Sequence, residues 1–206
     1  ADVIKVEPPG GDPLRRWSAT RGELEREDGA YFRFLHTSKR SVVGQAQDPE
    51  LEPLLAGADL AIDSSPPAEI DADALCERFP GLVWLSITPF GRKGPYAGRP
   101  ASELTIQAES GSVSGRGLLS MPPTMCGGNI SYFVGGTFAA VAALAAVQRA
   151  RRTGQGEQID FSLCEAMNVA GAVYSDLMHS LWGRPQTPGA PRTVEIPSIE
   201  PTLDGW

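Results

Sequence analysis

The sequence predicts an α/β protein with a mainly parallel β-sheet. Short β-rich segments alternate along the chain with segments whose apolar residues recur at helical spacing, the pattern of βαβ units. The clearest strand is "LVWLSITPFG" (82–91), which ends in a proline and a glycine. The clearest helix is an alanine-rich segment at 129–152 that ends in three arginines and Gly154.

Composition bounds the class of protein. With 206 residues, 41% hydrophobic and 21% charged, the chain is long enough for one substantial core, or for one domain and part of another. A net charge of −7 argues against nucleic acid or an anionic membrane as the main partner. Three widely spaced cysteines without a CxxC, only two histidines and no signal peptide favour a cytoplasmic protein without a metal site.

The first half of the chain begins with a strand at 3–7 that runs into the turn-forming cluster "PPGGDP". The segment 31–44 mixes aromatic and basic residues before a short apolar strand. A short helix is expected at 49–58 and a buried strand at 59–65.

The second half continues the alternation. A helix at 70–81 precedes the strand at 82–91, and a further helix at 101–111 leads into a Gly/Ser-rich loop at 111–120. After the long helix, the segment 157–183 predicts a short strand and a second helix. Residues 184–206 are proline-rich and extended, as in a linker.

Two glycine pairs, Gly127–Gly128 and Gly135–Gly136, bracket an uncharged stretch at the start of the long helix. The glycines predict that another group approaches the backbone closely there, because glycine has no side chain. The small residues along the helix predict that the helix packs closely against its neighbours. The apolar run from Tyr132 to Val147 is interrupted by glycines and Thr137, and we interpret it as a buried helix rather than a membrane span.

Candidate ligand-binding residues follow three predicted strands, where a parallel sheet places its ligands. They are basic residues and a loop glycine that suit phosphate groups, although solvated loop charges explain each cluster equally well. The candidates are Arg15, Arg16, Lys39, Arg40, Gly91, Arg92 and Lys93. No GxGxxG or P-loop pattern accompanies them.

Candidate catalytic residues are few. Tyr132 is placed to present a hydroxyl at the start of the long helix, or to pack as an aromatic. Glu165 and Glu103 lie on predicted helices, where glutamate is commonly a surface group. Cys164 is interpreted as a core residue and His179 as a helix-face residue.

Several stretches together resemble the class III CoA-transferases, the family of formyl-CoA transferase, carnitine CoA-transferase and α-methylacyl-CoA racemase. They are "ADVIKVEPPGGDPLR", "KRSV", "FPGLVWLSITPFGRKGPYAGRPASELTIQAESG" and "RRTGQGEQIDFSLCEAM". The resemblance implies a Rossmann-like large domain over 1–183, a linker at 184–206 toward a small domain, and two interlocked chains. It also implies a partial chain, because a family member is about twice this length.

The resemblance implies a CoA thioester as ligand, and the candidate residues for binding it become Arg15, Lys39, Arg40, Gly91 and Arg92. In these transferases an aspartate near the start of the long helix attacks the acyl-CoA carbonyl. Tyr132 stands at that position here, and Ser102 stands where the racemases carry a histidine. In the family, an Asn-Phe or Ser-Phe pair commonly follows the strand that corresponds to "DLAID". In this chain Ser64–Ser65 stands at that place.

Three hypotheses follow. The first is an enzyme that transfers CoA between an acyl-CoA and a small carboxylic acid, using Tyr132, Glu103 or Glu165. The second is a catalytically silent domain that pairs with an active one. The third is a racemase-like enzyme. A homodimer or a homologous partner domain is expected, and no metal, nucleic acid or membrane.

Overall fold

The structure is a computed structural model that describes residues 1–171 apart from 21, 23, 25–26, 46–47, 114–121 and 123. The predicted linker at 184–206, His179, the end of the second helix and most of the loop at 111–120 lie outside the described residues. The chain divides into two compact units, residues 1–58 and the residues from 59 onward.

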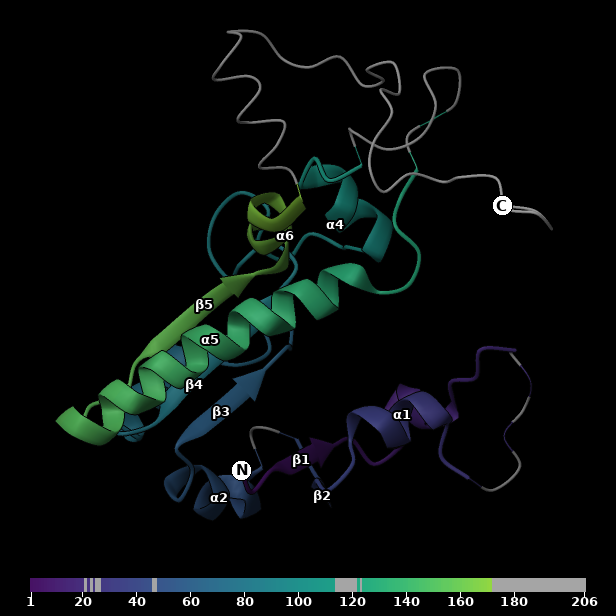
Figure 1. Cartoon of the computed structure of the whole chain (residues 1–206). Coiled ribbons are helices and arrows are strands. Elements are labelled where there is room, and N and C mark those ends of the chain that lie inside the picture. The colour runs from purple at the N-terminus through teal and green to yellow at the C-terminus, as the bar shows by residue number, and fades with distance from the viewer. Residues whose placement is uncertain are drawn as a thin grey trace, which may run out of the picture. The chain divides into compact units, whose positions relative to one another are not determined.

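The first unit contains two parallel strands, β1 (Ile4–Glu7) and β2 (Arg40–Val43). The strand predicted at 3–7 is confirmed. The other elements of this unit are short helices (Figure 1): η1 (Pro13–Arg16), α1 (Ala30–Leu35), η2 (Pro49–Leu51) and α2 (Glu52–Ala56).

Helix α1 was not predicted, because its six residues carry no side-chain cap and too little periodicity to detect. Tertiary contacts stabilise it instead. Phe32 is buried, the Arg15 guanidinium lies 4.2 Å from its ring centroid, and the Trp17 and Tyr31 rings lie 5.3 Å apart. The helix therefore depends on residues outside itself.

The second unit contains a parallel sheet in the order β3 (Leu60–Asp63), β4 (Val83–Thr88), β5 (Gln158–Ser162). In its register Leu85 lies opposite both Ile62 and Ile159. All described strand pairs are parallel, so the predicted α/β class with a parallel sheet is confirmed.

Helix α5 (Ile130–Thr153) runs along one face of this sheet (Figure 1). Its inward stripe consists of small residues spaced three or four apart, which lets the helix lie close to Val83 and Leu85. The buried residues of this stripe are Gly135, Ala139, Ala143, Ala146 and Ala150. Gly154 ends the helix in the left-handed conformation (φ 74°), as the sequence predicts.

The described part of the unit also contains three shorter helices: α3 (Ala72–Arg78), α4 (Glu103–Glu109) and α6 (Leu163–Gly171). Ile106 of α4 packs with Leu163 and Met167 of α6 in one core cluster, which also contacts the start of α5. This cluster holds α4 beside the first turn of α5. Cys164, expected in the core, is only half-buried, and burial raises the pKa of its thiol.

Candidate active site at the start of helix α5

The carboxylate of Glu103 lies against the first turn of α5. Its Oε1 accepts a hydrogen bond from the backbone N–H of Ser131 at 3.0 Å, and its Oε2 accepts one from the Ser131 hydroxyl at 2.5 Å. Ser131 is fully buried. Glu103 therefore satisfies one of the unpaired N–H groups at the helix N-terminus, where the helix dipole also favours a negative charge.

The residues next to Glu103 in the sequence place it at the start of α4. Ser102 caps α4: its hydroxyl accepts the N–H of Thr105, and the Thr105 hydroxyl accepts the N–H of Ser102 at 2.6 Å. Glu103 is consequently the first residue of α4, and the buried Ile106 turns that end of the helix toward α5.

The loop before α5 is held by the fully buried Gln107. Its amide nitrogen donates to Glu103 Oε1 (2.7 Å) and to the Cys126 carbonyl (3.2 Å), and its amide oxygen accepts the Cys126 N–H (2.9 Å). From the described residues Glu103 thus accepts three hydrogen bonds, fewer than the lone-pair sites of a carboxylate.

The four glycines of the opening stretch have different roles. Gly128 has a positive φ of 74°, which admits glycine far more readily than other residues. A Cβ on Gly135 would lie 2.3 Å from Leu163 Cδ2, so this glycine allows α5 and α6 to approach closely. A Cβ on Gly127 or Gly136 would meet no atom from elsewhere in the described residues within 4 Å, so packing against these residues does not require glycine there.

Tyr132 follows Ser131 directly and is 53% exposed. Within the part of the chain that the structure describes, no hydrogen bond to its hydroxyl is made. It is therefore a half-exposed side chain rather than a core aromatic.

Glu165 is exposed near the start of α6, where its backbone N–H donates to Ser162 Oγ at 3.3 Å. No described hydrogen bond or ion pair links its carboxylate to Glu103 or Tyr132. Of the three predicted catalytic candidates, Glu103 is bonded to Ser131, the residue before Tyr132. Glu165 has no described bond to Glu103 or Tyr132.

Arg92 lies at the carboxyl end of the sheet, with its side chain only 10% exposed. It donates to Asp63 (3.4 Å) and to the carbonyls of Pro67 (2.9 Å) and Ile70 (2.5 Å). Its backbone N–H donates to the Asp160 carboxylate at 2.9 Å. Arg92 therefore ties the loop after β4 to the segment after β3.

Gly91 precedes it with φ 86°, and a Cβ there would lie 3.6 Å from Asp160. The sequence alone did not point to Ser131, Gln107 or Asp63. Asp63 carries a signal that could have been used, because it is the last residue of β3 and so lies at the carboxyl end of a parallel sheet.

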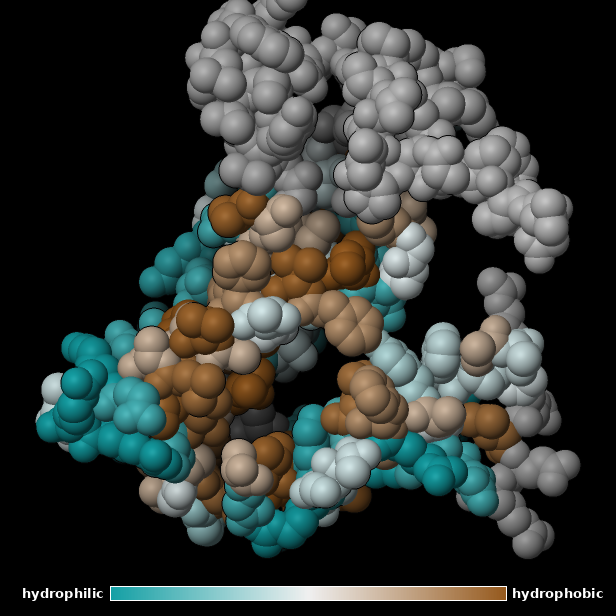
Figure 2. Space-filling view, in the orientation of Figure 1, coloured by the Kyte–Doolittle hydropathy of each residue, from teal (hydrophilic) through white to brown (hydrophobic). Residues whose placement is uncertain are grey.

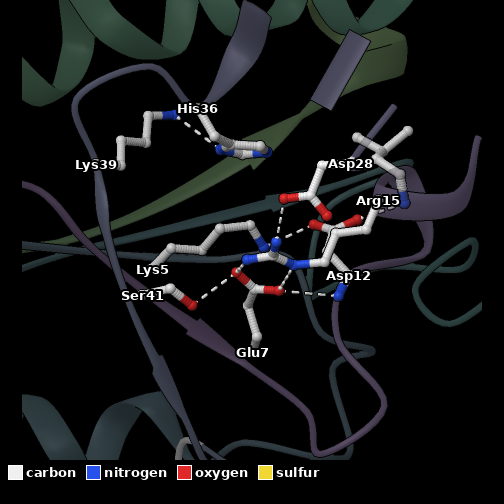
Figure 3. Close-up of polar contacts among 9 residues, drawn as sticks. Lys5, Glu7, Asp12, Arg15, Asp28, His36, Lys39 and Ser41 are labelled. Atoms are coloured by element: carbon white, nitrogen blue, oxygen red, sulfur yellow. Dashed lines mark hydrogen bonds and ion pairs between the residues drawn. The ribbon is translucent and has the colours of Figure 1, made fainter. Parts of the chain in front are cut away.

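The remaining basic candidates belong to the first unit, where Figure 3 shows a cluster of polar side chains around Glu7. Arg15 donates to both oxygens of Glu7 (2.7 and 2.8 Å) and to Asp28 (2.5 Å). Its charge is thus paired with two carboxylates. Lys39 lies 3.3 Å from His36 Nδ1, and Arg40 pairs with Asp2 at the surface.

The hydrogen bonds from Arg15 lower the pKa of Glu7 far below its ordinary value of 4.5, against the opposing effect of burial. Ser41 and the Asp12 N–H also donate to this carboxylate. A depressed folded-state pKa stabilises the fold above pH 4.5, and this contribution is lost as the pH falls below that value.

Glu7→Gln is therefore expected to lower the free energy of unfolding at pH 7 by about 2–3 kcal/mol and to flatten its decline in acid. The cost is below that of a fully buried pair because the Arg15 side chain is 31% exposed. Urea denaturation of the purified protein at pH 7 and pH 4 measures both effects. The control Asp2→Asn removes an exposed ion pair and should cost less than about 1 kcal/mol. An equal loss in the two variants would contradict the assignment.

Comparison with known proteins identifies the family. The model of CoA-transferase family III matches residues 1–206, the whole chain. The chain belongs to CoA-transferase family III. The recognition made from the sequence is thus confirmed.

Relatives and solved structures of CoA-transferase family III agree. The chain is 33% identical to succinyl-CoA:(R)-benzylsuccinate CoA-transferase subunit BbsE of Thauera aromatica, across the whole chain and 52% of that protein. It is 30% identical to succinate–glutarate CoA-transferase of Agrobacterium fabrum, across the whole chain and 55% of that protein. A crystal structure of a CAIB/BAIF family protein from Brucella suis matches with a TM-score of 0.81 and 29% identity, over 92% of this chain and 52% of that one. The chain spans about half the length of these relatives.

Proposed function

We propose that the protein to which this chain belongs transfers CoA from an acyl-CoA, with succinyl-CoA as the first donor to test, to a carboxylic acid. Family membership and the succinyl and dicarboxylate substrates in the relatives' names support the reaction class. The observation that carries the proposal is the Glu103 carboxylate, held against the first turn of α5 by two hydrogen bonds from Ser131.

In this proposal Glu103 supplies the carboxylate that the family places on α5 itself. A Glu103 oxygen attacks the thioester carbonyl, the C–S bond breaks, and CoA leaves as a thiolate while an anhydride forms. The thiolate then attacks the glutamyl carbonyl, which releases the donor acid and leaves a glutamyl-CoA thioester. The acceptor carboxylate attacks that thioester, the C–S bond breaks, and a second anhydride forms as the CoA thiolate leaves. The thiolate then attacks the acceptor carbonyl of this anhydride, which gives the new acyl-CoA and frees the Glu103 carboxylate.

Ser131 and Gln107 would hold the carboxylate in place during these steps. Each donates from a fully buried side chain, so neither has to be desolvated when substrate binds. Exposed Lys39 and Arg40 remain candidates for CoA phosphates. Homodimer formation, a cytoplasmic location and a reaction without metal remain predictions.

The test is incubation of the intact gene product with succinyl-CoA and a panel of dicarboxylic acids, followed by separation of the CoA thioesters. We expect one acid to gain CoA in the amount that succinyl-CoA loses. Hydroxylamine added during turnover should convert the glutamyl thioester to a hydroxamate, which peptide mass spectrometry would locate at Glu103. If CoA is exchanged but the hydroxamate is located at another residue, the role of Glu103 is contradicted. If no acid gains CoA, the proposed function is contradicted.

A second candidate function is a catalytically silent domain, favoured by the tyrosine at the family's nucleophile position and by the engagement of Glu103 with three donors. It predicts no CoA exchange by the unmodified protein. Tyr132→Asp is then expected to introduce exchange, because it restores a carboxylate at an exposed position on α5. Tyr132→Asn, which adds no carboxylate, is the matched control. CoA exchange by the unmodified protein would contradict this account, and equal activity in the asparagine variant would show that the gain does not come from the restored carboxylate.

A further inference from the structure

Asn129 stands at the N-cap position of α5 but does not cap the helix. Its side chain makes no capping hydrogen bond, although asparagine is among the residues that best satisfy the first N–H groups of a helix. Its backbone ψ of 58° also lies outside the extended range that capping residues normally adopt. Asn129 is exposed, so the start of α5 carries a capping group that is not used for capping.

Glu103 takes the place that the Asn129 side chain would have. Its Oε1 accepts the N–H of Ser131, the second residue of α5, and this is a donor that an N-cap side chain normally satisfies. Asn129 and Glu103 therefore compete for one N–H group. The carboxylate is the acceptor in the structure, as expected for a negative charge at the positive end of a helix.

The proposed reaction weakens this acceptor. In the glutamyl-CoA thioester, one oxygen of Glu103 has left with the donor acid, and the carbonyl oxygen that remains is uncharged and has two lone pairs. Three donors contact the carboxylate before the reaction: the Ser131 N–H, the Ser131 hydroxyl and the Gln107 amide. At least one of these donors must then find another acceptor.

The backbone N–H of Ser131 is the donor that requires a new partner. The Gln107 amide keeps the Cys126 carbonyl as an acceptor at 3.2 Å, and the Ser131 hydroxyl can rotate about its C–O bond. The Ser131 N–H has its direction fixed by the helix. Because Ser131 is fully buried, an unpaired N–H group there would be costly.

The rest of α5 supplies no charged acceptor near this end. No charged residue occurs from Ile130 to Gln148, and Figure 2 shows a hydrophobic surface over α5. The turn before the helix has room to rearrange, because a Cβ on Gly127 or Gly128 would meet no atom from elsewhere in the described residues within 4 Å. Asn129 is therefore the side chain placed to accept the Ser131 N–H when Glu103 does not.

We propose that Asn129 is a reserve cap of α5, whose carboxamide oxygen accepts the Ser131 N–H while Glu103 carries an acyl or CoA group. When the Glu103 carboxylate is regenerated, the N–H returns to it. This role rests on the proposed function, in which Glu103 is the nucleophile. Asn129 is thus a positioning residue, because it acts through the first turn of α5 and not on the substrate.

The first test needs no turnover and uses amide hydrogen exchange at Ser131 in the intact gene product. Asn129→Ala alone should change the exchange rate of the Ser131 N–H by less than about twofold, because Glu103 still accepts it. In the Glu103→Ala background, Asn129→Ala should raise that rate about fivefold, the loss expected for a helix cap. Asn129→Ser is the matched control, because serine also caps, and it should leave the rate low.

Equal exchange rates in Glu103→Ala and in the double variant would overturn the proposal. A rise caused by Asn129→Ala alone would also overturn it, because Asn129 would then cap α5 already in the resting protein.

The second test is the CoA-transfer assay with saturating substrates. Asn129→Ala should lower the turnover number about fivefold, and Asn129→Ser should restore it. Equal turnover in the parent protein and both variants would overturn the role during the reaction. If the parent protein transfers no CoA, the proposed function fails and this role fails with it, whereas hydrogen exchange by itself decides whether Asn129 caps α5 in the absence of Glu103.

Discussion

Replacing Glu103 with glutamine is expected to lower the rate of CoA transfer by roughly 10²–10⁴-fold. The amide keeps the shape of the side chain but cannot act as the nucleophile, and it places an N–H group against one of the donors that now surround the carboxylate. The rate should be measured with saturating succinyl-CoA and acceptor, alongside thermal unfolding to show that the variant is folded.

The control Ser131→Ala separates chemistry from positioning. This variant keeps the carboxylate and removes only the hydroxyl that donates to Oε2. If Glu103 reacts with the thioester, Ser131→Ala should cost far less activity than Glu103→Gln. Similar small losses in the two variants would mean that Glu103 only caps α5, and the silent-domain account would then be favoured.

Gly156→Ala is expected to lower the free energy of unfolding by more than about 4 kcal/mol, enough to prevent recovery of folded protein. A Cβ at this position would lie 2.0 Å from the Leu82 carbonyl oxygen and 2.4 Å from its carbon. Both are backbone atoms of the residue before β4, and the Gly156 N–H donates to the Pro80 carbonyl at 2.7 Å. The chain cannot move away without losing that bond.

Gly136→Ala is the matched control, because a Cβ there meets nothing within 4 Å and alanine favours a helix by up to about 1 kcal/mol over glycine. Soluble yield and urea denaturation of the two variants give the comparison. A normally stable Gly156→Ala protein would show that the segment between α5 and β5 is held less closely to β4 than the structure indicates.

The glycines of α5 and its C-terminal end differ in how well the local sequence predicts their roles. The glycine at 154 is recognisable from the arginine-rich helix end before it, and its left-handed conformation follows from that position. Gly135 and Gly136 are indistinguishable in sequence, yet an added Cβ would overlap Leu163 at Gly135 and would meet no described atom within 4 Å at Gly136. The difference depends on which side of α5 meets α6, and no local pattern encodes it.

The partners of charged residues likewise depend on tertiary packing. Arg15 and Arg92 each stand in a glycine-rich loop after a strand. These sequence surroundings are typical of phosphate-binding residues. In the folded chain their donors contact carboxylates and carbonyls of the protein. A basic residue in sequence carries no information about the partner that tertiary packing brings to it.

The sequence by itself determined the α/β class, the parallel strands, the extent of the long helix and the family. Periodicity, helix-end residues and the order of motifs are local properties, so they can be recognised without knowing how the elements pack. Only the tertiary structure decided that Glu103 meets Ser131, 28 positions away, and that α5 turns its small residues inward and its bulky ones outward. Both depend on how α4, α5 and the sheet pack together, and that packing is a property of the whole fold.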